Sequence, residues 1–244
     1  MTAQLRPLCC AVLLSTLWAI SPAFATDATP TPTSTALTPG MSVEEIVTRM
    51  GQSNSLRAAA LSAYDGRRSY SLSYRGFPSD RDAQEEVVAH YTASAGKSFD
   101  VISKRGSKMI QSKVFAKLLE SEREASNAEN QRQTALTPEN YTFTLLGSRP
   151  SSYGGCYLLR VEPRREDKFL YRGQVCVNAT DFAPESIDAE PAKNPSFWIK
   201  KTRIEHRYQK IGQFWLPASN HTVTNFRMGG IATLNIMYSE YELR

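Results

Sequence analysis

The sequence has few of the residues on which reactive sites depend, and it lacks any membrane-spanning run after residue 20. Of its 244 residues, 4 are cysteine and 3 are histidine. The sequence also has no long stretch of charge of one sign, because its 29 Lys and Arg are interspersed with 24 Asp and Glu and form no basic tracts. These shortages argue against a nucleic-acid-binding protein. The content of 41% hydrophobic and 10% aromatic residues argues against a disordered chain.

The usual motifs of catalysis and cofactor binding are missing as well. The sequence contains no GxGxxG, GxSxG, HExxH or CxxC and no acidic run at calcium-loop spacing. Gly96-Lys97-Ser98 resembles the end of a phosphate-binding loop, but that loop requires glycine where Tyr91 stands. His90, His206 and His221 fall within predicted strands, where exposed histidines are favoured over a triad assembled from distant residues. We therefore expect no enzyme, no cofactor and no metal site.

The first 25 residues have the order of parts typical of a cleavable export signal. Arg6 is followed by an apolar run from Leu8 to Ile20 and by Ala23-Phe24-Ala25, after which cleavage is expected. A membrane anchor would need a run of roughly 20 residues. A lipoprotein signal would need its cysteine after the apolar region, whereas Cys9 and Cys10 come early. We expect a soluble exported protein without a lipid anchor, whose net charge falls from +5 to +4 when Arg6 is lost.

A spacer and one domain are expected after the signal. Residues 26–40 are rich in Thr and Pro and have no core pattern, so they are expected to be flexible. Residues 41–244 are long enough to form a single domain with a substantial core.

The domain is expected to begin with a helix. Ser42 and Glu45 have the spacing of a capping box, in which each side chain satisfies a free backbone N–H. The helical spacing is carried by Val43, Ile46, Val47 and Met50. Gly51 and the polar residues 53–55 weaken the middle, so the pattern predicts two short helices. The second would carry Leu56, Ala60, Leu61 and Tyr64.

The period then changes to two, which indicates strands. Three strands are predicted by Tyr70, Leu72 and Tyr74, by Val87, Ala89 and Tyr91, and by Phe99 and Val101. Residues 110–125 return to helical spacing, and residues 127–138 are expected to form a polar loop. A run of strands follows from Tyr141 to the C-terminus. The fold class is therefore α+β, mostly β, with about ten strands and two or three helices.

Residues 156–176 predict a hairpin about the charged turn 164–168. Cys156 and Cys176, the two cysteines left after cleavage, are equidistant from Glu166. Pairing residues whose numbers sum to 332 places the cysteines opposite one another at about 4.5–5.5 Å between Cα atoms, which suits a disulfide. The same register gathers an apolar face from Tyr157, Leu159, Val161, Tyr171, Gly173 and Val175. Two buried free thiols are the alternative, and thiol titration of unfolded, non-reduced protein distinguishes them.

The predicted strand 198–209 carries a partly basic stripe. Lys201, Arg203, Glu205 and Arg207 alternate onto one face. Such a stripe could contact anionic headgroups or a protein partner, and a solvated outer face is the simpler interpretation.

Four short motifs carry a family resemblance. They are Tyr171-Arg172-Gly173-Gln174, Ala179 to Ala183, Pro195 to Lys200, and Phe214 to Pro217. With the order of elements they resemble a divergent branch of the bacterial outer-membrane lipoprotein-sorting proteins, relatives of LolA and LolB. The resemblance implies an unclosed antiparallel β-barrel around a hydrophobic cavity, with lid helices, in a soluble periplasmic protein. No residue matches the basic lid and loop positions of the well-studied carriers one for one.

The resemblance leads to a carrier of lipoprotein acyl chains or other lipids as the first hypothesis, in a protein expected to be monomeric and to contact membranes only transiently. The cavity residues are then expected among Tyr70, Leu72, Tyr74, Tyr141, Phe143, Leu145, Tyr157, Leu159, Val161, Tyr171, Val175, Ile204 and Tyr208. The lid helix is expected to present Val114, Phe115, Leu118 and Leu119. The alternative for each residue is ordinary core packing. A second hypothesis keeps the fold as an envelope protein-binding or stress-sensing module whose cavity is filled by side chains. An envelope hydrolase is a third.

Overall fold

The computed structural model describes residues 40–194 and 196–244, so the predicted signal and residues 26–39 of the predicted spacer lie outside the described residues. In this part of the chain, ten strands form one antiparallel sheet in the order β3-β2-β1-β10-β9-β8-β7-β6-β5-β4. The strands are β1 (Ala63–Arg75), β2 (Arg81–Thr92), β3 (Gly96–Gly106), β4 (Tyr141–Ser151), β5 (Gly154–Pro163), β6 (Tyr171–Asn178), β7 (Pro184–Pro191), β8 (Ile199–Ile211), β9 (Phe214–Phe226) and β10 (Ile231–Leu243). The helical elements are α1 (Val43–Ala60), α2 (Lys108–Ile110), a π-helical turn η1 (Gln111–Phe115), α3 (Ala116–Ala125) and α4 (Ala128–Thr134).

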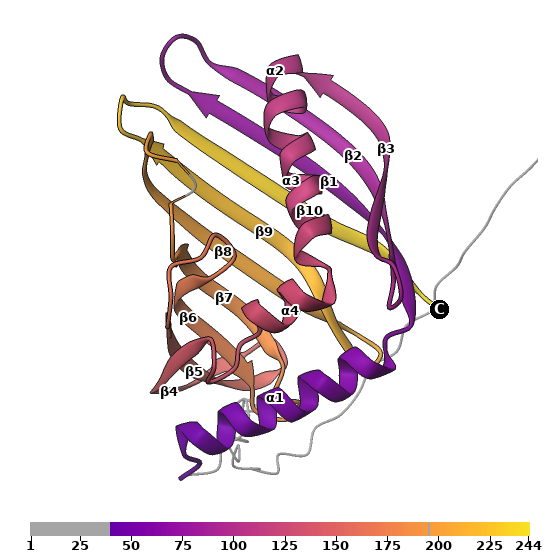
Figure 1. Ribbon diagram of the computed structural model, residues 1–244, viewed down its shortest axis with the longest axis vertical. Coiled ribbons are helices and arrows are strands. Elements are labelled where there is room, and N and C mark those ends of the chain that lie inside the picture. Colours follow the sequence, from indigo (N-terminus) through magenta and orange to yellow (C-terminus); the bar gives the residue numbers. More distant parts are fainter. Residues whose placement is uncertain (1–39, 195) are drawn as a thin grey trace, which may run out of the picture. The chain divides into compact units, whose positions relative to one another are not determined.

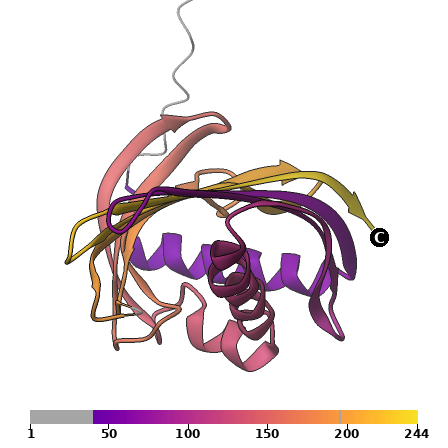
Figure 2. The same ribbon diagram turned by 90° about the horizontal axis from the view of Figure 1, so that it is seen from above.

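The sheet curves without closing. The strands β3 and β4 lie at opposite ends of the strand order and do not pair with each other. The sheet bends around the helices, which lie on its concave side (Figures 1 and 2). The prediction of an unclosed antiparallel barrel of about ten strands with helices is therefore confirmed.

The connection between β3 and β4 supplies the lid. These two edge strands follow one another in the sequence, so the chain must cross from one edge of the sheet to the other. It makes the crossing through α2, η1, α3 and α4 (Figure 1). The helices α2, η1 and α3 share an apolar stripe that faces the interior, where Ile110, Phe115 and Leu119 are buried.

The helix α1 is continuous, so the prediction of two short helices is wrong. Its start agrees with the capping box, because the Ser42 hydroxyl accepts a hydrogen bond from the Glu45 amide at 3.2 Å. A glycine inside a helix costs about 1 kcal/mol, which the full burial of Ile46 and Met50 offsets. The second half carries no core face, since Leu56 is 73% exposed. Leu61 caps the helix, and Tyr64 belongs to β1.

Two further local predictions need correction. Residues 127–138 contain the helix α4 instead of only a loop, because the Asn127 side chain caps it by accepting from the Asn130 amide at 2.8 Å. The helix predicted over 110–125 is present, but η1 interrupts its α-helical hydrogen bonding.

The β5–β6 hairpin forms with its register shifted by two residues. Leu159 lies opposite Val175 and Cys156 opposite Asn178, so paired numbers sum to 334 instead of 332. The turn is asymmetric, because Leu170 is buried before β6 begins and its carbonyl accepts from the Ala192 amide. A shift of two preserves the faces, and the apolar set still points inward.

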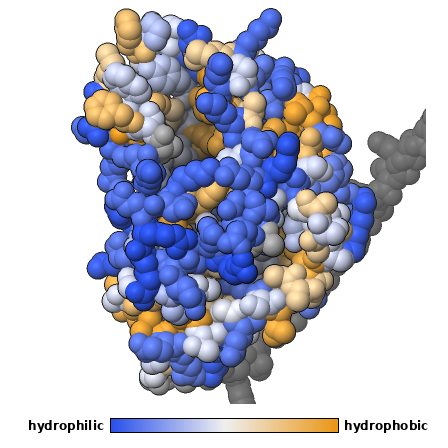
Figure 3. Space-filling model, in the orientation of Figure 1, coloured by the Kyte–Doolittle hydropathy of each residue, from blue (hydrophilic) through white to orange (hydrophobic). Residues whose placement is uncertain are grey.

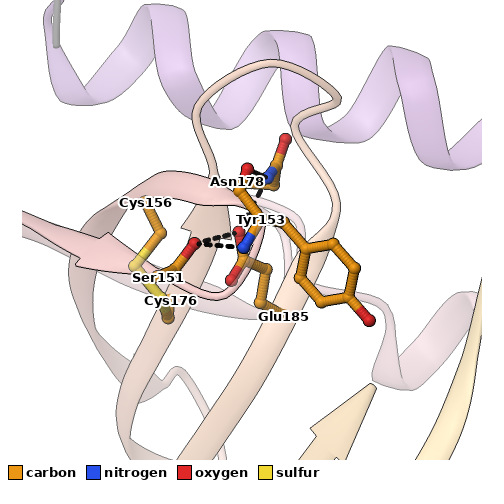
Figure 4. Close-up of a disulfide and its surroundings, with 6 residues drawn as sticks. All are labelled: Ser151, Tyr153, Cys156, Cys176, Asn178 and Glu185. Carbon is orange, nitrogen blue, oxygen red and sulfur yellow. Dashed lines mark hydrogen bonds between the residues drawn. A yellow bond between two sulfur atoms is a disulfide. The ribbon is translucent and has the colours of Figure 1, made fainter. Parts of the chain in front are cut away.

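The Cys156–Cys176 disulfide is present (Figure 4). Its Cα atoms are 5.5 Å apart, and it joins diagonal neighbours on β5 and β6 instead of the directly opposite pair that we predicted. Beside it, Glu185 accepts hydrogen bonds from the Asn178 amide group at 2.7 Å and from the Ser151 hydroxyl at 3.0 Å. This polar group fastens the end of the β4–β5 hairpin to β6 and β7.

The interior contains two apolar clusters. The first, here the α1 core, packs α1 against β4–β7 and buries Ile46, Val47, Met50, Tyr141, Tyr157, Leu159, Val161, Leu170, Val175, Val177, Phe182, Ile187, Ala189 and Ala192. The second, here the lid core, packs α2, η1 and α3 against β1, β2 and β10 and buries Tyr70, Leu72, Ala83, Val87, Ile110, Phe115, Leu119, Ile236 and Tyr238. Each half of the sheet is thus covered by its own helix.

Candidate functional site

A cavity of about 580 Å³ lies beside the lid core. Its walls come from α2, η1, α3 and the inner face of β1 and β8–β10, and we call it the lid cavity. It opens at the end of the sheet that carries the β1–β2 and β9–β10 turns. Its lining consists of Leu72, Tyr74, Pro78, Arg81, Met109, Ile110, Val114, Leu118, Pro191, Ile199, Thr202, Thr222, Thr224, Phe226, Ala232 and Leu234. Its volume falls within the range of ligand pockets, roughly 300–1,000 Å³. Figure 3 shows the hollow on this face, with hydrophobic side chains inside it.

The hydroxyl groups of the lining each make a hydrogen bond within the protein. The hydroxyls of Thr202 and Thr224 are 3.2 Å apart and bond to each other. The Thr222 hydroxyl donates to the Asn220 side-chain oxygen Oδ1 at 2.8 Å, and the Tyr74 hydroxyl donates to the Phe77 backbone carbonyl at 2.6 Å. These hydroxyls do not need a polar ligand to avoid an unsatisfied buried group, because each already makes a hydrogen bond. The wall therefore favours an apolar occupant.

One charged side chain lines the lid cavity. Arg81 begins β2 and is half-buried, with no ion-pair partner among the described residues. A guanidinium in this place can pair with a carboxylate or phosphate while the apolar part of the same molecule lies inside.

A buried ionic cluster ties the lid to the sheet farther along α3. The Glu122 carboxylate accepts from Arg68 and, at 3.3 Å, from the Tyr70 hydroxyl, and Lys97 lies 3.6 Å from it. Burial favours the neutral acid, but Arg68 and Lys97 outweigh it and lower the pKa of Glu122 below its usual value. Arg68, 2% exposed, is sandwiched between the rings of Phe99 and Tyr238. The charge of Glu122 thus holds α3 on β1 and β3.

The region between the two cores contains a neutral histidine. Burial lowers the pKa of His206 to about 4. Its Nδ1 accepts from the Asn220 side chain at 3.1 Å, and its Nε2 has no hydrogen-bond partner in the described part of the chain. The ring packs against Tyr208 and Tyr238. Burial likewise raises the pKa of Tyr208 to about 12, so both side chains are neutral near pH 7.

The structure distributes the predicted cavity residues over both halves. Leu72, Tyr74, Val114 and Leu118 line the lid cavity. Tyr70, Phe115 and Leu119 are buried in the lid core. The α1 core contains Tyr141, Tyr157, Leu159, Val161 and Val175, with Phe143, Leu145, Tyr171 and Tyr208 packed against it. Ile204 lies half-buried on the inner face of β8.

Sequence reasoning missed much of the actual lining. Met109 and Ile110 begin the lid, and β9 and β10 contribute Thr222, Thr224, Phe226, Ala232 and Leu234. The period-two pattern of β9 and β10 was the available signal. Threonine and alanine at alternate positions do not stand out as cavity residues, although their small side chains leave the space open.

The stripe on β8 is not a basic surface. Lys201 pairs with Glu190 at 2.6 Å, and Arg207 pairs with Asp188 at 3.0 Å. Arg203 lies 3.3 Å from Glu205 of the same strand. The outer face of β7 and β8 is a network of opposite charges, which agrees with a solvated face.

No helix within 40–194 and 196–244 has the length and apolar character to cross a bilayer. In the same residues, no group of three or more His, Cys, Asp and Glu side chains could hold a metal ion.

The comparison with known proteins finds similarity among solved structures. The sequence matches no family model, and no curated protein is similar to it. A DUF1329 family protein from Desulfovibrio piger is 14% identical, with a TM-score of 0.43, over 82% of this chain and 92% of that one. A putative outer membrane lipoprotein-sorting protein domain from Vibrio parahaemolyticus is 11% identical, with a TM-score of 0.41, over 80% and 91%. A LolA superfamily protein from Nitrosomonas europaea is 11% identical, with a TM-score of 0.40, over 84% and 94%. The last two carry the name of the family that the sequence motifs resemble.

Proposed function

We propose that this protein is a soluble exported carrier that binds the acyl chains of lipoproteins or other lipids in the lid cavity, and that it acts in the periplasm in lipoprotein sorting. The observation that carries the proposal is an apolar cavity of about 580 Å³ whose hydroxyls are already hydrogen-bonded within the protein. Each CH₂ group kept from water contributes about 0.8 kcal/mol, so such a wall stabilises an acyl chain without directed polar contacts.

The position of Arg81 supports a ligand with an anionic end. It is the charged residue among the described residues of the lining, and it is the first residue of β2, three residues after Pro78. A carboxylate or phosphate can pair with it while the chain extends toward Leu234 and Val114.

The same proposal includes binding without chemical conversion. The ligand would enter and leave unchanged, as transport requires. The second hypothesis, a protein-binding module, expects an interior filled by side chains, and the lid cavity does not favour it.

The direct test is extraction and displacement. Mass spectrometry of solvent extracts from gently purified protein is expected to find intact acyl lipids, and a fluorescent fatty acyl probe is expected to bind and be displaced by them. Ala232→Trp places a large side chain inside the cavity, since Ala232 is one of its lining residues. We expect it to weaken probe binding at least about tenfold, as ring and chain compete for one space.

The matched control is Thr233→Trp. Successive side chains of a strand point to opposite faces, so Thr233 turns away from the cavity. A folded Ala232→Trp variant with the probe affinity of Thr233→Trp would contradict the proposal, as would extracts free of lipid from a protein that does not bind the probe.

A further inference from the structure

The mouth of the lid cavity is surrounded by exposed apolar side chains from four separate segments. Phe77 is 82% exposed, Phe197 and Met228 are each 75% exposed, and Trp198 and Met109 are 56% and 51% exposed. They belong to the β1–β2 turn, the β7–β8 loop, the β9–β10 turn and α2. Large apolar side chains gathered so openly on one surface mark an interaction site. We call these five residues the rim.

Contacts between the segments hold the rim together. Arg227 donates to the Phe197 carbonyl at 2.7 Å, lies over the Phe197 ring, and donates from its backbone to the Trp198 carbonyl at 2.9 Å. The β1–β2 turn packs closely on the β9–β10 turn, because a Cβ at Gly76 would lie 2.6 Å from the Gly230 Cα. The rim is therefore a fixed surface feature and not a set of independent loop tips.

The rim is continuous with the cavity. Pro78 lines the cavity next to Phe77, Ile199 next to Trp198, and Phe226 shortly before Met228. Met109 belongs to both the rim and the lining. An apolar surface thus runs from the exposed rim into the interior.

The charge around the rim is positive. Residues 75–82, 107–110, 192–194, 196–200 and 226–231 contain six basic residues and two acidic ones, a net charge of +4. The two acids, Asp80 and Asp82, both pair with Arg75. Lys108 and Lys200 are exposed and have no ion-pair partner among the described residues.

We propose that the rim docks the protein, cavity mouth first, on the surface of a bilayer that contains anionic lipid. Aromatic side chains prefer the interface between headgroups and acyl chains, and basic residues beside them are attracted to the negative surface. Neither apolar insertion nor charge alone gives firm attachment, and the rim combines both. The proposal concerns the surface of the protein and does not depend on which ligand fills the cavity.

Vesicle sedimentation tests the docking. The purified protein is expected to sediment with vesicles of equal parts phosphatidylglycerol and phosphatidylethanolamine, more weakly with phosphatidylcholine vesicles, and more weakly at high salt. Phe197→Ser combined with Met228→Ser is expected to lower partitioning at least about tenfold, from the apolar area no longer buried. Leu56→Ser combined with Met237→Ser, at sites 73% and 57% exposed outside the rim, is the matched control and should bind normally.

Two further measurements test the docking independently, in case the Phe197→Ser and Met228→Ser double variant folds poorly. Lys200→Gln is expected to lower binding to anionic vesicles about fivefold while binding to phosphatidylcholine is unchanged. Brominated acyl chains are expected to quench Trp198 fluorescence, and the quenching should vanish in Trp198→Phe. Equal binding by folded rim and control variants, or no sedimentation with anionic vesicles, would overturn the proposal and leave the rim as a protein-docking surface.

Discussion

The two halves of the interior differ in how completely side chains fill the space between the sheet and the helix that covers it. In the α1 core, Leu159 and Val161 are fully buried, and the nearby disulfide joins β5 to β6. In the lid half, packing is incomplete, an ion cluster fixes α3, and about 580 Å³ remains open. One sheet with one alternation pattern thus supports a dense core at one end and a hollow at the other. What differs is the side chains that the covering helix and the facing strands supply.

The largest expected effect comes from comparing one leucine in each half. Leu159→Ala should lower the free energy of unfolding by about 3–4 kcal/mol, because it empties a space that close-packed neighbours cannot fill. Leu234 is only half-buried and borders open space, so Leu234→Ala removes fewer contacts and should cost about 1 kcal/mol. Denaturant titration of both variants measures the difference. Equal losses would mean that the lid half is packed as tightly as the α1 core.

The disulfide should act on stability and not on the cavity. Replacing both cysteines, as Cys156→Ser with Cys176→Ser, should cost about 3 kcal/mol, because the bond closes a loop with a sequence separation of 20. Acyl probe binding under native conditions should be unchanged, since neither cysteine lines the lid cavity. Reduced wild-type protein is the control for the substitutions. A large loss of probe affinity in a folded variant would show that the two halves are coupled.

A smaller effect should appear with pH at the boundary between the halves. His206 packs on Tyr208, beside the α1 core, and on Tyr238 of the lid core. Its pKa falls from 6.5 to about 4 on folding, so between these values the unfolded chain binds more protons. The contribution of His206 to stability should be nearly complete above about pH 6.5 and fall by roughly 3 kcal/mol as the pH drops to 4.

The contribution of His206 can be separated from that of the carboxylates. His206→Gln removes the titrating group, and its stability should change less than that of wild type between pH 6.5 and 4. Glu122, with its lowered pKa, loses its favourable charge only at lower pH. Parallel stability curves for wild type and variant over this window would show that His206 is not buried neutral.

Alternation along the strands was enough to predict the sheet and its inner face. Tyr70, Leu72 and Tyr74 follow it, and in the β5–β6 hairpin it kept the faces correct although the register moved by two. Register depends on the turn, and burial of Leu170 could not be inferred from local sequence. The helix α4 was missed because its segment is polar and has no apolar face.

The location of the cavity was beyond local patterns. Every predicted lining residue was apolar or aromatic, yet the open space lies where small residues such as Ala232 and Thr224 face η1 and α3. The rim likewise depends on four segments that are distant in sequence and meet only in the folded chain.

The course of the chain between β3 and β4 restricts how a ligand can enter. The segment that covers the cavity continues at each end into an edge strand, β3 at one edge of the sheet and β4 at the other. It is therefore anchored at both ends, unlike a flap that is attached at one end only. A segment anchored in this way cannot move far from the cavity unless β3 or β4 separates from the sheet. In the proposed carrier, an acyl chain would therefore enter lengthwise, past Met109 and Phe226, with only a small outward displacement of the segment.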